Sequence, residues 1–375
     1  MQNNVSWPVA SLSLKYHIIK ELGSGSYGTV SLAVLAKDRN ALFNDPRVRK
    51  FAVKVFGEDV TYDIASREVR MLQAVREEPC NENIVCFVEN FEDDIVGQLI
   101  VVTNFVSGTT MYEAQIENPN AFRAVVRSLL EGLHYMHSRN VVHRDIKGDN
   151  IIIVNPNSIS PFGVFLDLGL ACRGVDDCIS QPHSVDEHRS PELVEEILEK
   201  KKLSLAQYKA SDVWFLALAL YQLGRRRKLF SDKKLRELIT QKKQRRQTIL
   251  TQRDRAILEN EIAQLKKQLY VDLRKQHQKQ LGGETIFDTE FLRTNQLKRI
   301  TDDNTCRWII SEMLQLNWRR RLLPLTGVMM IEKFEVESRK SGFDNSNMRY
   351  GLITDPPNHP GAQESDFETR DEIEV

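Results

Sequence analysis

Residues 142–150, which read Val-His-Arg-Asp-Ile-Lys-Gly-Asp-Asn, bring together side chains that could act on a reacting group. Asp145 is a carboxylate that could accept a proton, and Lys147 is a cation two positions later. Asn150 and, after a short apolar run, Asp167 offer oxygen atoms of the kind that hard divalent cations prefer. The spacing therefore predicts a site that combines a base, a cation and two metal ligands.

A glycine-rich turn near the N-terminus has the spacing Gly-x-Gly-x-x-Gly, at Gly23, Gly25 and Gly28. Residues 16–35 alternate between apolar and polar, which predicts a strand, the turn and a second strand. Without β-carbons, the glycines would let backbone amides approach a polyphosphate. Dinucleotide-binding folds and plain hairpins share this pattern, but the turn here leads into the strand Val30–Val34 and not into the helix that dinucleotide binding needs.

One lysine stands inside an apolar strand. In the run 51–56, Lys54 lies among apolar neighbours on its own face of the strand, so its charge needs an anionic partner. Glu68 could provide it, since this residue falls on the apolar stripe of a helix predicted over 62–75. The alternatives are a lysine on a solvated face and a solvated helix glutamate.

The remaining elements divide the chain into a strand-rich front half and a helix-rich back half. Two further strands are predicted over 84–91 and 98–105, and the small residues 107–109 favour a hinge. Apolar side chains at helical spacing then predict a helix over 121–138, which leads the chain into the 142–150 motif.

Five motifs in this order make the chain resemble the eukaryotic-type protein kinase family. They are Gly-x-Gly-x-x-Gly-x-Val, Ala-x-Lys, His-Arg-Asp-x-x-x-x-Asn, Asp-x-Gly and x-Pro-Glu, between about Tyr16 and Arg321 with one interruption. The resemblance implies an α+β, bilobal kinase fold, with a small antiparallel β-rich N-lobe that carries one key helix and a larger, mostly helical C-lobe. The expected segments are an N-terminal extension (1–13), the N-lobe (14–104), the C-lobe (105–337) and an acidic, disordered tail (338–375).

The resemblance also implies the reaction, which is transfer of the γ-phosphate of ATP to a serine or threonine hydroxyl of a protein substrate. Asp145 would accept the hydroxyl proton, and Lys147 resembles the lysine with which serine/threonine kinases contact the γ-phosphate. Lys54, oriented by Glu68, would hold the α- and β-phosphates.

Magnesium, with manganese as a possible substitute, is the metal that the resemblance implies, and Asp167 and Asn150 would be its ligands. The other cofactor-binding residues would surround the nucleotide, with glycines over the phosphates, apolar side chains around the adenine and a small residue behind it. They are Gly23, Gly25, Gly28, Val30, Ala52, Thr103, Asn104, Val106 and Ile152.

Several further residues would support the site if the resemblance holds. Four of them would stack into the regulatory spine of the family, namely Leu72, Phe87, His143 and Leu168. Asp212 would brace the backbone of the catalytic loop, although an aspartate that opens an apolar helix could instead be only an N-terminal cap. Glu192 and Arg321 would tie the activation segment to the C-lobe.

The chain departs from the family pattern in the activation segment. Val185 stands where serine/threonine kinases normally have a threonine whose hydroxyl bridges the base and the lysine, and valine cannot form that hydrogen bond. The adjacent Ser184 could substitute if the loop is shifted by one residue.

The arginine before the base, Arg144, usually pairs with a phosphate on the activation loop in this family. This loop offers Ser180 and Ser184 as phosphate acceptors, and the acidic pair Asp176 and Asp177 could mimic a phosphate in part. We therefore hypothesise that activity depends only weakly on phosphorylation of the loop.

The interruption of the family pattern is a basic stretch over 225–280. It holds 18 Lys and Arg against 6 Asp and Glu, a net charge of about +12 in a chain whose charges sum to zero. Its apolar residues fall at helical spacing, which predicts one or two long amphipathic helices. They could pack on the C-lobe as a solvated hairpin, or form a docking site for an acidic protein, nucleic acid or anionic membrane. The acidic tail from 338 could fold back and shield this stretch.

The composition of the 375 residues is that of a folded, soluble protein, and no apolar run approaches the roughly 20 residues of a membrane span. The N-terminus lacks the pattern of a secretory signal, so we expect a cytoplasmic or nuclear protein. Five cysteines at scattered spacings predict reduced thiols and no disulfide framework. Because Cys172 and Cys178 flank a loop near the expected site, a redox role is the alternative.

Two other function classes remain open. A pseudokinase scaffold, which binds ATP and partners without transfer, would keep the fold but lose Lys54, Asp145 or Asp167, and all three are present. Small-molecule kinases generally lack the lysine at position 147 and the Ser-Pro-Glu segment.

Overall fold

The computed structural model describes residues 7–25, 27–40, 45, 47–95, 97–179, 189–225, 237–242, 252–281, 304–315 and 317–340. The chain divides into two units, residues 1–333 and residues 334–375. Everything described below lies in the first unit, apart from the last residues of one helix.

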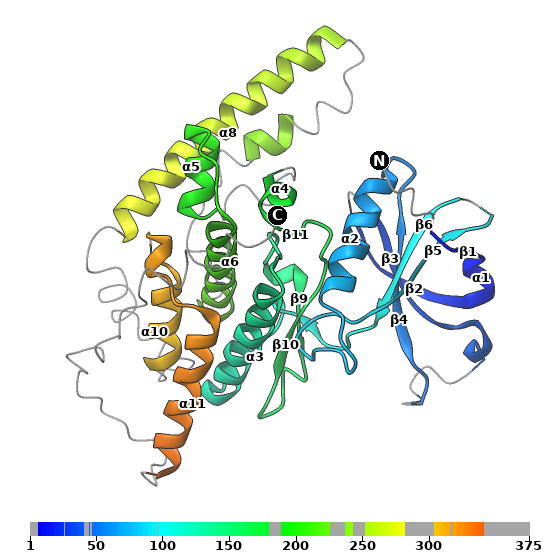
Figure 1. Cartoon of the computed structure of the whole chain (residues 1–375), viewed down its shortest axis with the longest axis horizontal. Helices are drawn as coiled ribbons and strands as arrows, with labels where there is room; N and C mark the ends of the chain where they lie inside the picture. The colour runs from blue at the N-terminus through cyan, green and yellow to red at the C-terminus, as the bar shows by residue number, and fades with distance from the viewer. Residues whose placement is uncertain are drawn as a thin grey trace, which may run out of the picture. The chain divides into compact units, whose positions relative to one another are not determined.

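A six-stranded sheet forms the N-terminal part of the first unit, with one long helix packed against it (Figure 1). The strand order is β1-β5-β6-β4-β3-β2, and neighbours are antiparallel except for the parallel pair β1 and β5. The strands are β1 (Val9–Ala10), β2 (Tyr16–Gly25), β3 (Gly28–Leu35), β4 (Lys50–Phe56), β5 (Phe87–Asp93) and β6 (Leu99–Asn104), and the helices are α1 (Leu12–Lys15), the 3-10 turn η1 (Ala36–Asp38) and α2 (Tyr62–Ala74).

These elements confirm the predicted hairpin, the strand around Lys54 and the helix that carries Glu68. The predicted strand over 84–91 begins later, at Phe87, because Ile84 makes only an isolated bridge to Phe165. The antiparallel sheet with α2 and the helical region that follows are the expected kinase fold.

Residues ahead of the hairpin join the sheet and contact α2. Strand β1 pairs with β5, and the indole N–H of Trp7 donates to the Ser66 hydroxyl at 3.2 Å. The Trp7 ring also lies 5.7 Å from that of Tyr62, measured between centroids. Because Trp7 is only 6% exposed, these early residues belong to the packed structure around α2.

The C-terminal part is mostly helical, with two small sheets ordered β10-β9-β7 and β11-β8. Helix α3 confirms the prediction over 121–138 and starts two residues earlier, because the Asn118 side chain accepts the backbone N–H groups of Asn120 and Ala121. The elements are β7 (Thr109–Thr110), α3 (Pro119–Ser138), β8 (Val141–Val142), η2 (Gly148–Asn150), β9 (Ile151–Val154), β10 (Phe162–Phe165), β11 (Cys172–Arg173), α4 (Val175–Ile179), α5 (Pro191–Glu199), α6 (Leu205–Arg225), α8 (Gln252–Leu281), α10 (Asn304–Met313), η5 (Trp318–Arg320) and α11 (Pro324–Lys340). Among the described residues, no helix has both the length and the apolar content that crossing a membrane would require.

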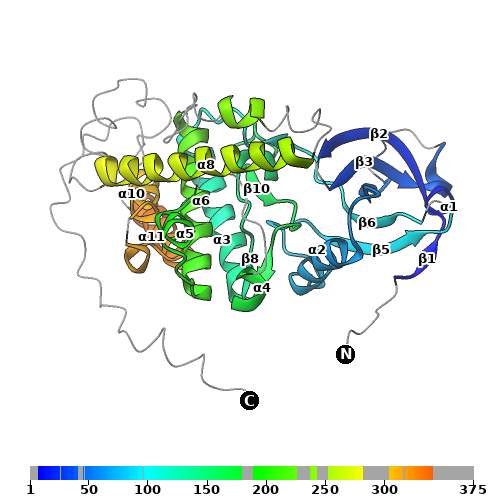
Figure 2. The same ribbon diagram turned by 90° about the horizontal axis from the view of Figure 1, so that it is seen from above.

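Much of the basic stretch is the long helix α8, which lies beside α5 (Figure 2). Leu258, Leu269, Tyr270 and Leu273 are buried, whereas Ile257 is 51% exposed. The apolar side chains of α8 are therefore packed mainly in the second half of the helix, and the hairpin interpretation stays a prediction. Docking of an acidic partner stays a prediction, since the parts at 226–236 and 243–251 lie outside the described residues, as does the tail beyond 340.

The expectation of reduced thiols is wrong for four of the five cysteines. Disulfides join Cys80 to Cys86 and Cys172 to Cys178, and Cys306 is buried elsewhere. Each bridged pair is six residues apart in sequence, and the folded backbone brings their Cα atoms to 5.8 and 5.1 Å. Both Cα–Cα distances are within the range of a disulfide, and only the tertiary structure determines them.

Candidate functional site

Strand β4 and helix α2 bring Lys54 and Glu68 together. Lys54 Nζ donates to Glu68 Oε2 at 2.6 Å, and the two side chains are 14% and 7% exposed. Burial by itself would lower the pKa of Lys54, but the attraction of Glu68 and Asp167 outweighs it, so the net pKa is raised and the lysine stays charged. Glu68 is therefore the anionic partner that the sequence predicted for Lys54.

The catalytic loop, residues 142–150, gathers its polar side chains around Asp145. Lys147 Nζ donates to Asp145 Oδ2 at 2.7 Å, and Asn150 Nδ2 donates to the same oxygen at 2.8 Å. Asn150 Nδ2 also donates to the Asp145 carbonyl at 2.9 Å. Asp145 is only 6% exposed, so these donors compensate for the burial of its charge.

The two predicted metal ligands fit a hard cation by their chemistry. Because the Asn150 amide nitrogen is engaged with Asp145, its oxygen is the atom left to act as a ligand. Asp167 is 47% exposed and its Oδ1 lies 3.8 Å from Lys54 Nζ. Carboxylate and amide oxygens are the ligand types that magnesium accepts.

The backbone at Asp167 is held in an uncommon conformation. Its φ is 54°, in the left-handed region, and the Gly169 N–H donates to its Oδ1 at 3.1 Å. A β-carbon at Gly169 would meet Asp167 Oδ1 at 3.0 Å and Glu68 Oε2 at 3.1 Å. Burial raises the pKa of Asp167, but Lys54 and the Gly169 N–H together lower it below its usual range, so the carboxylate is ionised at neutral pH.

Asp212 supports the catalytic loop from helix α6. One carboxylate oxygen accepts the His143 N–H at 2.7 Å, and the other accepts the Arg144 N–H at 2.8 Å. The side chain is 0% exposed. Helix α6 begins at Leu205, so Asp212 is not at its start, and the alternative of an N-terminal cap is wrong.

His137 is a partner of Asp212 that the sequence interpretation missed. Its Nε2 lies 3.0 Å from Asp212 Oδ2, and burial lowers the pKa of this histidine despite the hydrogen bond. The available signal was its place on the buried face of α3, together with Leu133 and Met136. That signal predicts burial but does not identify the partner.

The residues expected to form the spine are all buried. Leu72, Phe87, His143 and Leu168 have exposed fractions between 0 and 5%. His143 Nε2 lies 2.9 Å from the Leu166 carbonyl, which fixes the ring beside the strand that precedes Asp167. The spine positions thus lie in the continuous core that joins α2 to the helical part.

The residues expected around the nucleotide come from the six-stranded sheet, from β9 of the three-stranded sheet and, for Val106, from the segment that follows β6. Gly28 has φ 142° and a β-carbon there would lie 2.1 Å from the Val55 carbonyl oxygen, so the turn requires glycine. At Gly23 and Gly25 a β-carbon would have no described heavy atom within 4 Å beyond the adjacent residues in the chain. The sheet register sets Ala52 opposite Thr103. The apolar and hinge positions are half-buried, and they are Val30, Ala52, Thr103, Asn104, Val106 and Ile152.

The pair Glu192 and Arg321 is present and deeply buried. Arg321 Nη2 donates to Glu192 Oε2 at 2.7 Å, and the side chains are 1% and 3% exposed. Arg321 also donates to the Ala210 carbonyl at 2.9 Å, which links α5 to α6. Ser180, Ser184 and Val185, on which the acceptor-binding expectations depend, lie outside the described residues.

Comparison with known proteins identifies the family of the chain. A family model described as the protein kinase domain matches residues 16–329. The chain is 30% identical over 223 residues to serine/threonine-protein kinase ksp1 of Schizosaccharomyces pombe, a match that covers 56% of this chain and 43% of the relative. It is 28% identical over 222 residues to a serine/threonine-protein kinase stk11 homolog of Dictyostelium discoideum, covering 56% of this chain and 34% of the relative. The chain thus spans less than half the length of these curated relatives.

Proposed function

The chain belongs to the protein kinase domain family, and from this premise we propose that it transfers the γ-phosphate of ATP to serine or threonine hydroxyls of a protein. The observation that carries the proposal is the Lys54–Glu68 ion pair, formed beside Asp167 while Lys147 and Asn150 converge on Asp145. These two groups of side chains support the proposal, because phosphoryl transfer depends on positioned charges around the phosphates and the incoming hydroxyl.

Asp145 is proposed as the base. Its carboxylate would orient the incoming hydroxyl and accept the proton as the bond to phosphorus forms. Lys147 and Asn150 hold the Oδ2 atom of Asp145 by two hydrogen bonds, of 2.7 and 2.8 Å, which limits the directions in which this carboxylate can turn. Positioning of this kind is a major part of catalysis in phosphoryl transfer.

Lys54 is proposed to hold the α- and β-phosphates of ATP. The buried Glu68 keeps the ammonium in place, and the charged state of Lys54 suits an anionic ligand. Asp167 and Asn150 would hold magnesium, which when bound neutralises charge on the phosphates. Gly23, Gly25 and Gly28 would leave room for the phosphates above the hairpin.

The preference for serine and threonine rests on Lys147 and on the relatives. Lys147 occupies the position that resembles the lysine of serine/threonine kinases, and its contact with Asp145 supports a role at the reacting groups. The relatives named above are called serine/threonine-protein kinases. The scaffold alternative is less well supported, because Lys54, Asp145 and Asp167 are all present and Lys54 lies 3.8 Å from Asp167.

The test is a transfer assay with the full chain, labelled ATP, magnesium and a generic basic protein, followed by identification of the phosphorylated amino acid. Asp145→Asn should lower transfer at least 100-fold, since the substituted amide cannot accept the proton. Asp149→Asn is the matched control, because Asp149 is an exposed aspartate in the same loop, and it should retain near wild-type transfer. Wild-type protein that binds ATP but transfers nothing would favour the scaffold instead.

A further inference from the structure

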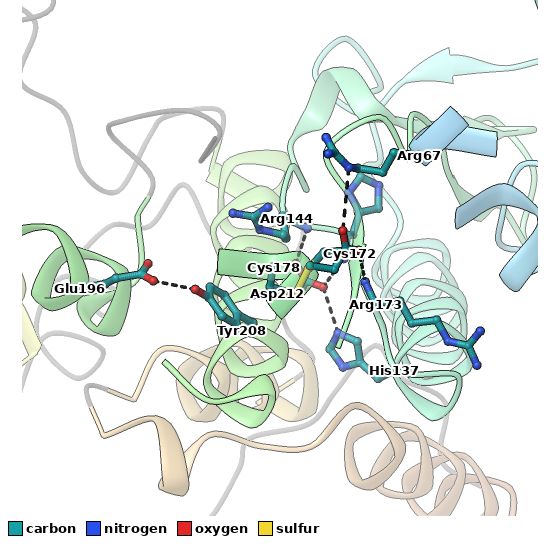
Figure 3. Close-up of a disulfide and its surroundings, with 11 residues drawn as sticks. Arg67, His137, Arg144, Cys172, Arg173, Cys178, Glu196, Tyr208 and Asp212 are labelled. Carbon is teal, nitrogen blue, oxygen red and sulfur yellow. Dashed lines mark hydrogen bonds and ion pairs between the residues drawn. A yellow bond between two sulfur atoms is a disulfide. The ribbon is translucent and has the colours of Figure 1, made fainter. Parts of the chain in front are cut away.

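A short loop closed by a disulfide follows the Asp167-Leu168-Gly169 motif. Cys172 in β11 is bridged to Cys178 in α4, and both cysteines are fully buried. Cys172 also pairs with Val142 of β8, the strand that opens the catalytic loop. The bridge closes residues 172–178 into a loop, and the strand pairing joins this loop to the entry of the catalytic loop. Figure 3 shows the Arg67 side chain reaching toward the loop at 172–178.

The loop presents one of its two adjacent acids to helix α2. Asp177 Oδ1 lies 3.9 Å from Arg67 Nε, and its Oδ2 accepts the Arg173 N–H at 2.8 Å. The Arg67 and Asp177 side chains are 20% and 24% exposed, so water screens their charges only in part. The neighbouring Asp176, by contrast, is exposed.

Arg67 is the immediate neighbour of Glu68 in helix α2. It precedes Glu68 in α2, so an attraction on Arg67 acts on the helix turn that carries Glu68 to Lys54. Helices move as stiff units, so a contact at one residue constrains its neighbours in the same turn. A charge at position 177 therefore influences whether Glu68 stays within reach of Lys54.

We propose that Asp177 is a positioning residue that holds helix α2 in place through Arg67, and that the Cys172–Cys178 disulfide holds Asp177 in its position. Asp177 acts through Arg67 on the helix that carries Glu68, and the pairing of Cys172 with Val142 joins the Asp177 loop to the strand that opens the catalytic loop. The inference rests on the proposed kinase activity and adds to it how the site is kept in its active arrangement. It assigns the effect to Asp177 alone and not to the acidic pair.

The primary test compares three variants in the transfer assay. Asp177→Asn keeps the shape but loses the charge, and we expect kcat/KM to fall about fivefold, the effect of one partly exposed ion pair. Asp177→Glu should recover most of the loss, and the matched control Asp176→Asn should equal wild type. Equal rates for the Asn variants at 176 and 177 would overturn the proposal.

The coupling of Asp177 to Arg67 is tested by a double-mutant cycle. Arg67→Gln should lower kcat/KM by a similar factor, and adding Asp177→Asn to it should cost little more, because the shared interaction is already lost. Losses that multiply independently would show that Asp177 does not act through α2.

A measurement that needs no activity keeps the proposal separate from the proposed function. Amide hydrogen exchange over residues 62–74 should be faster in Asp177→Asn than in wild type, and unchanged in Asp176→Asn. If the wild-type chain transfers no phosphate, the proposed function fails, and the exchange rates still decide the role of Asp177. Unchanged exchange in Asp177→Asn would count against the inference even in an active enzyme.

The disulfide is tested with a double alanine variant at Cys172 and Cys178, which leaves the Cys80–Cys86 bridge in place. The double substitution should lower wild-type kcat/KM toward that of Asp177→Asn and have little further effect in the Asp177→Asn background. Full activity of the double alanine variant would remove the disulfide from the proposal.

Discussion

Two charged regions of the C-terminal part are stabilised in different ways. Beneath the catalytic loop, Asp212 is fully buried and its carboxylate accepts two backbone N–H groups and contacts His137. On helix α8 the charges are mostly exposed, as at Lys275, whose side chain is 71% exposed and lies 3.7 Å from Asp272. Helix α8 is held instead by the burial of Leu269, Tyr270 and other apolar side chains.

The difference follows from the cost of removing a charge from water. A buried carboxylate is stable only when several donors replace its hydration, so the contacts of Asp212 are numerous and geometrically fixed. An exposed charge keeps its water and gains little from a partner. We therefore expect substitutions of charged residues to have large effects near the catalytic loop and small effects on α8, while apolar substitutions matter on α8.

The largest difference is expected between two arginine–glutamate pairs. Arg321→Met leaves Glu192 buried without its cation, and should lower the free energy of unfolding by about 3–5 kcal/mol. Arg274 on α8 pairs with Glu199 of α5, but the side chains are 40% and 47% exposed. Arg274→Met should therefore change the free energy of unfolding by less than about 1 kcal/mol. Urea unfolding of both variants measures this, and similar losses would contradict the comparison.

A second comparison lies within α8 itself. Leu273→Ala removes a side chain that is 3% exposed and should destabilise the protein by about 2–4 kcal/mol through lost burial and a cavity. The control is Ile257→Ala, at a position 51% exposed, which should cost less than about 1 kcal/mol. Equal effects would mean that the two ends of the helix are packed alike.

The smallest predicted effect concerns His277, a buried residue of α8 that packs against α6. His277 is 2% exposed and its ring lies 5.1 Å from that of Trp214, between centroids. Burial, with a smaller contribution from Arg321, lowers the pKa of His277 from 6.5 to about 3. Above pH 6.5 His277 is mostly neutral in both the folded and the unfolded protein. It therefore contributes little pH dependence to the free energy of unfolding in that range.

Below that pH the unfolded chain takes up a proton that the folded chain does not bind until about pH 3, so the free energy of unfolding falls. The fall due to His277 should reach about 2 kcal/mol at pH 5. Urea unfolding at pH 7 and pH 5 measures it, with His277→Leu as the reference. An equal pH dependence in wild type and variant would show that His277 is protonated in the folded protein.

Much of the candidate site could be predicted from the sequence because its residues act through local spacing. Asp145, Lys147 and Asn150 lie within one short loop, so their order alone places them together. The need of Lys54 for an anion followed from its place in an apolar strand, and the helix periodicity selected Glu68. These inferences depend on chain geometry over a few residues, which the sequence carries directly.

Contacts between distant elements depend on which surfaces meet. The predicted contact of Asp212 with the backbone of the catalytic loop is present, but the sequence interpretation set Asp212 at the start of its helix, whereas α6 begins at Leu205. His137 showed only that it belonged to a buried helix face. The disulfides were missed because scattered spacings do not reveal which sulfur atoms the backbone brings within bonding range.

The sequence by itself determined the kind of chemistry, since residue types and short spacings fix which groups are available and in what order. The tertiary structure decided how those groups are held, because ion pairs and hydrogen bonds form between elements far apart in the chain. Arg67 and Asp177 illustrate the division, as they are separated by 110 positions and meet only when α2 packs beside the loop after Asp167. An acid in that loop is visible in the sequence, and its partner is visible only in the fold.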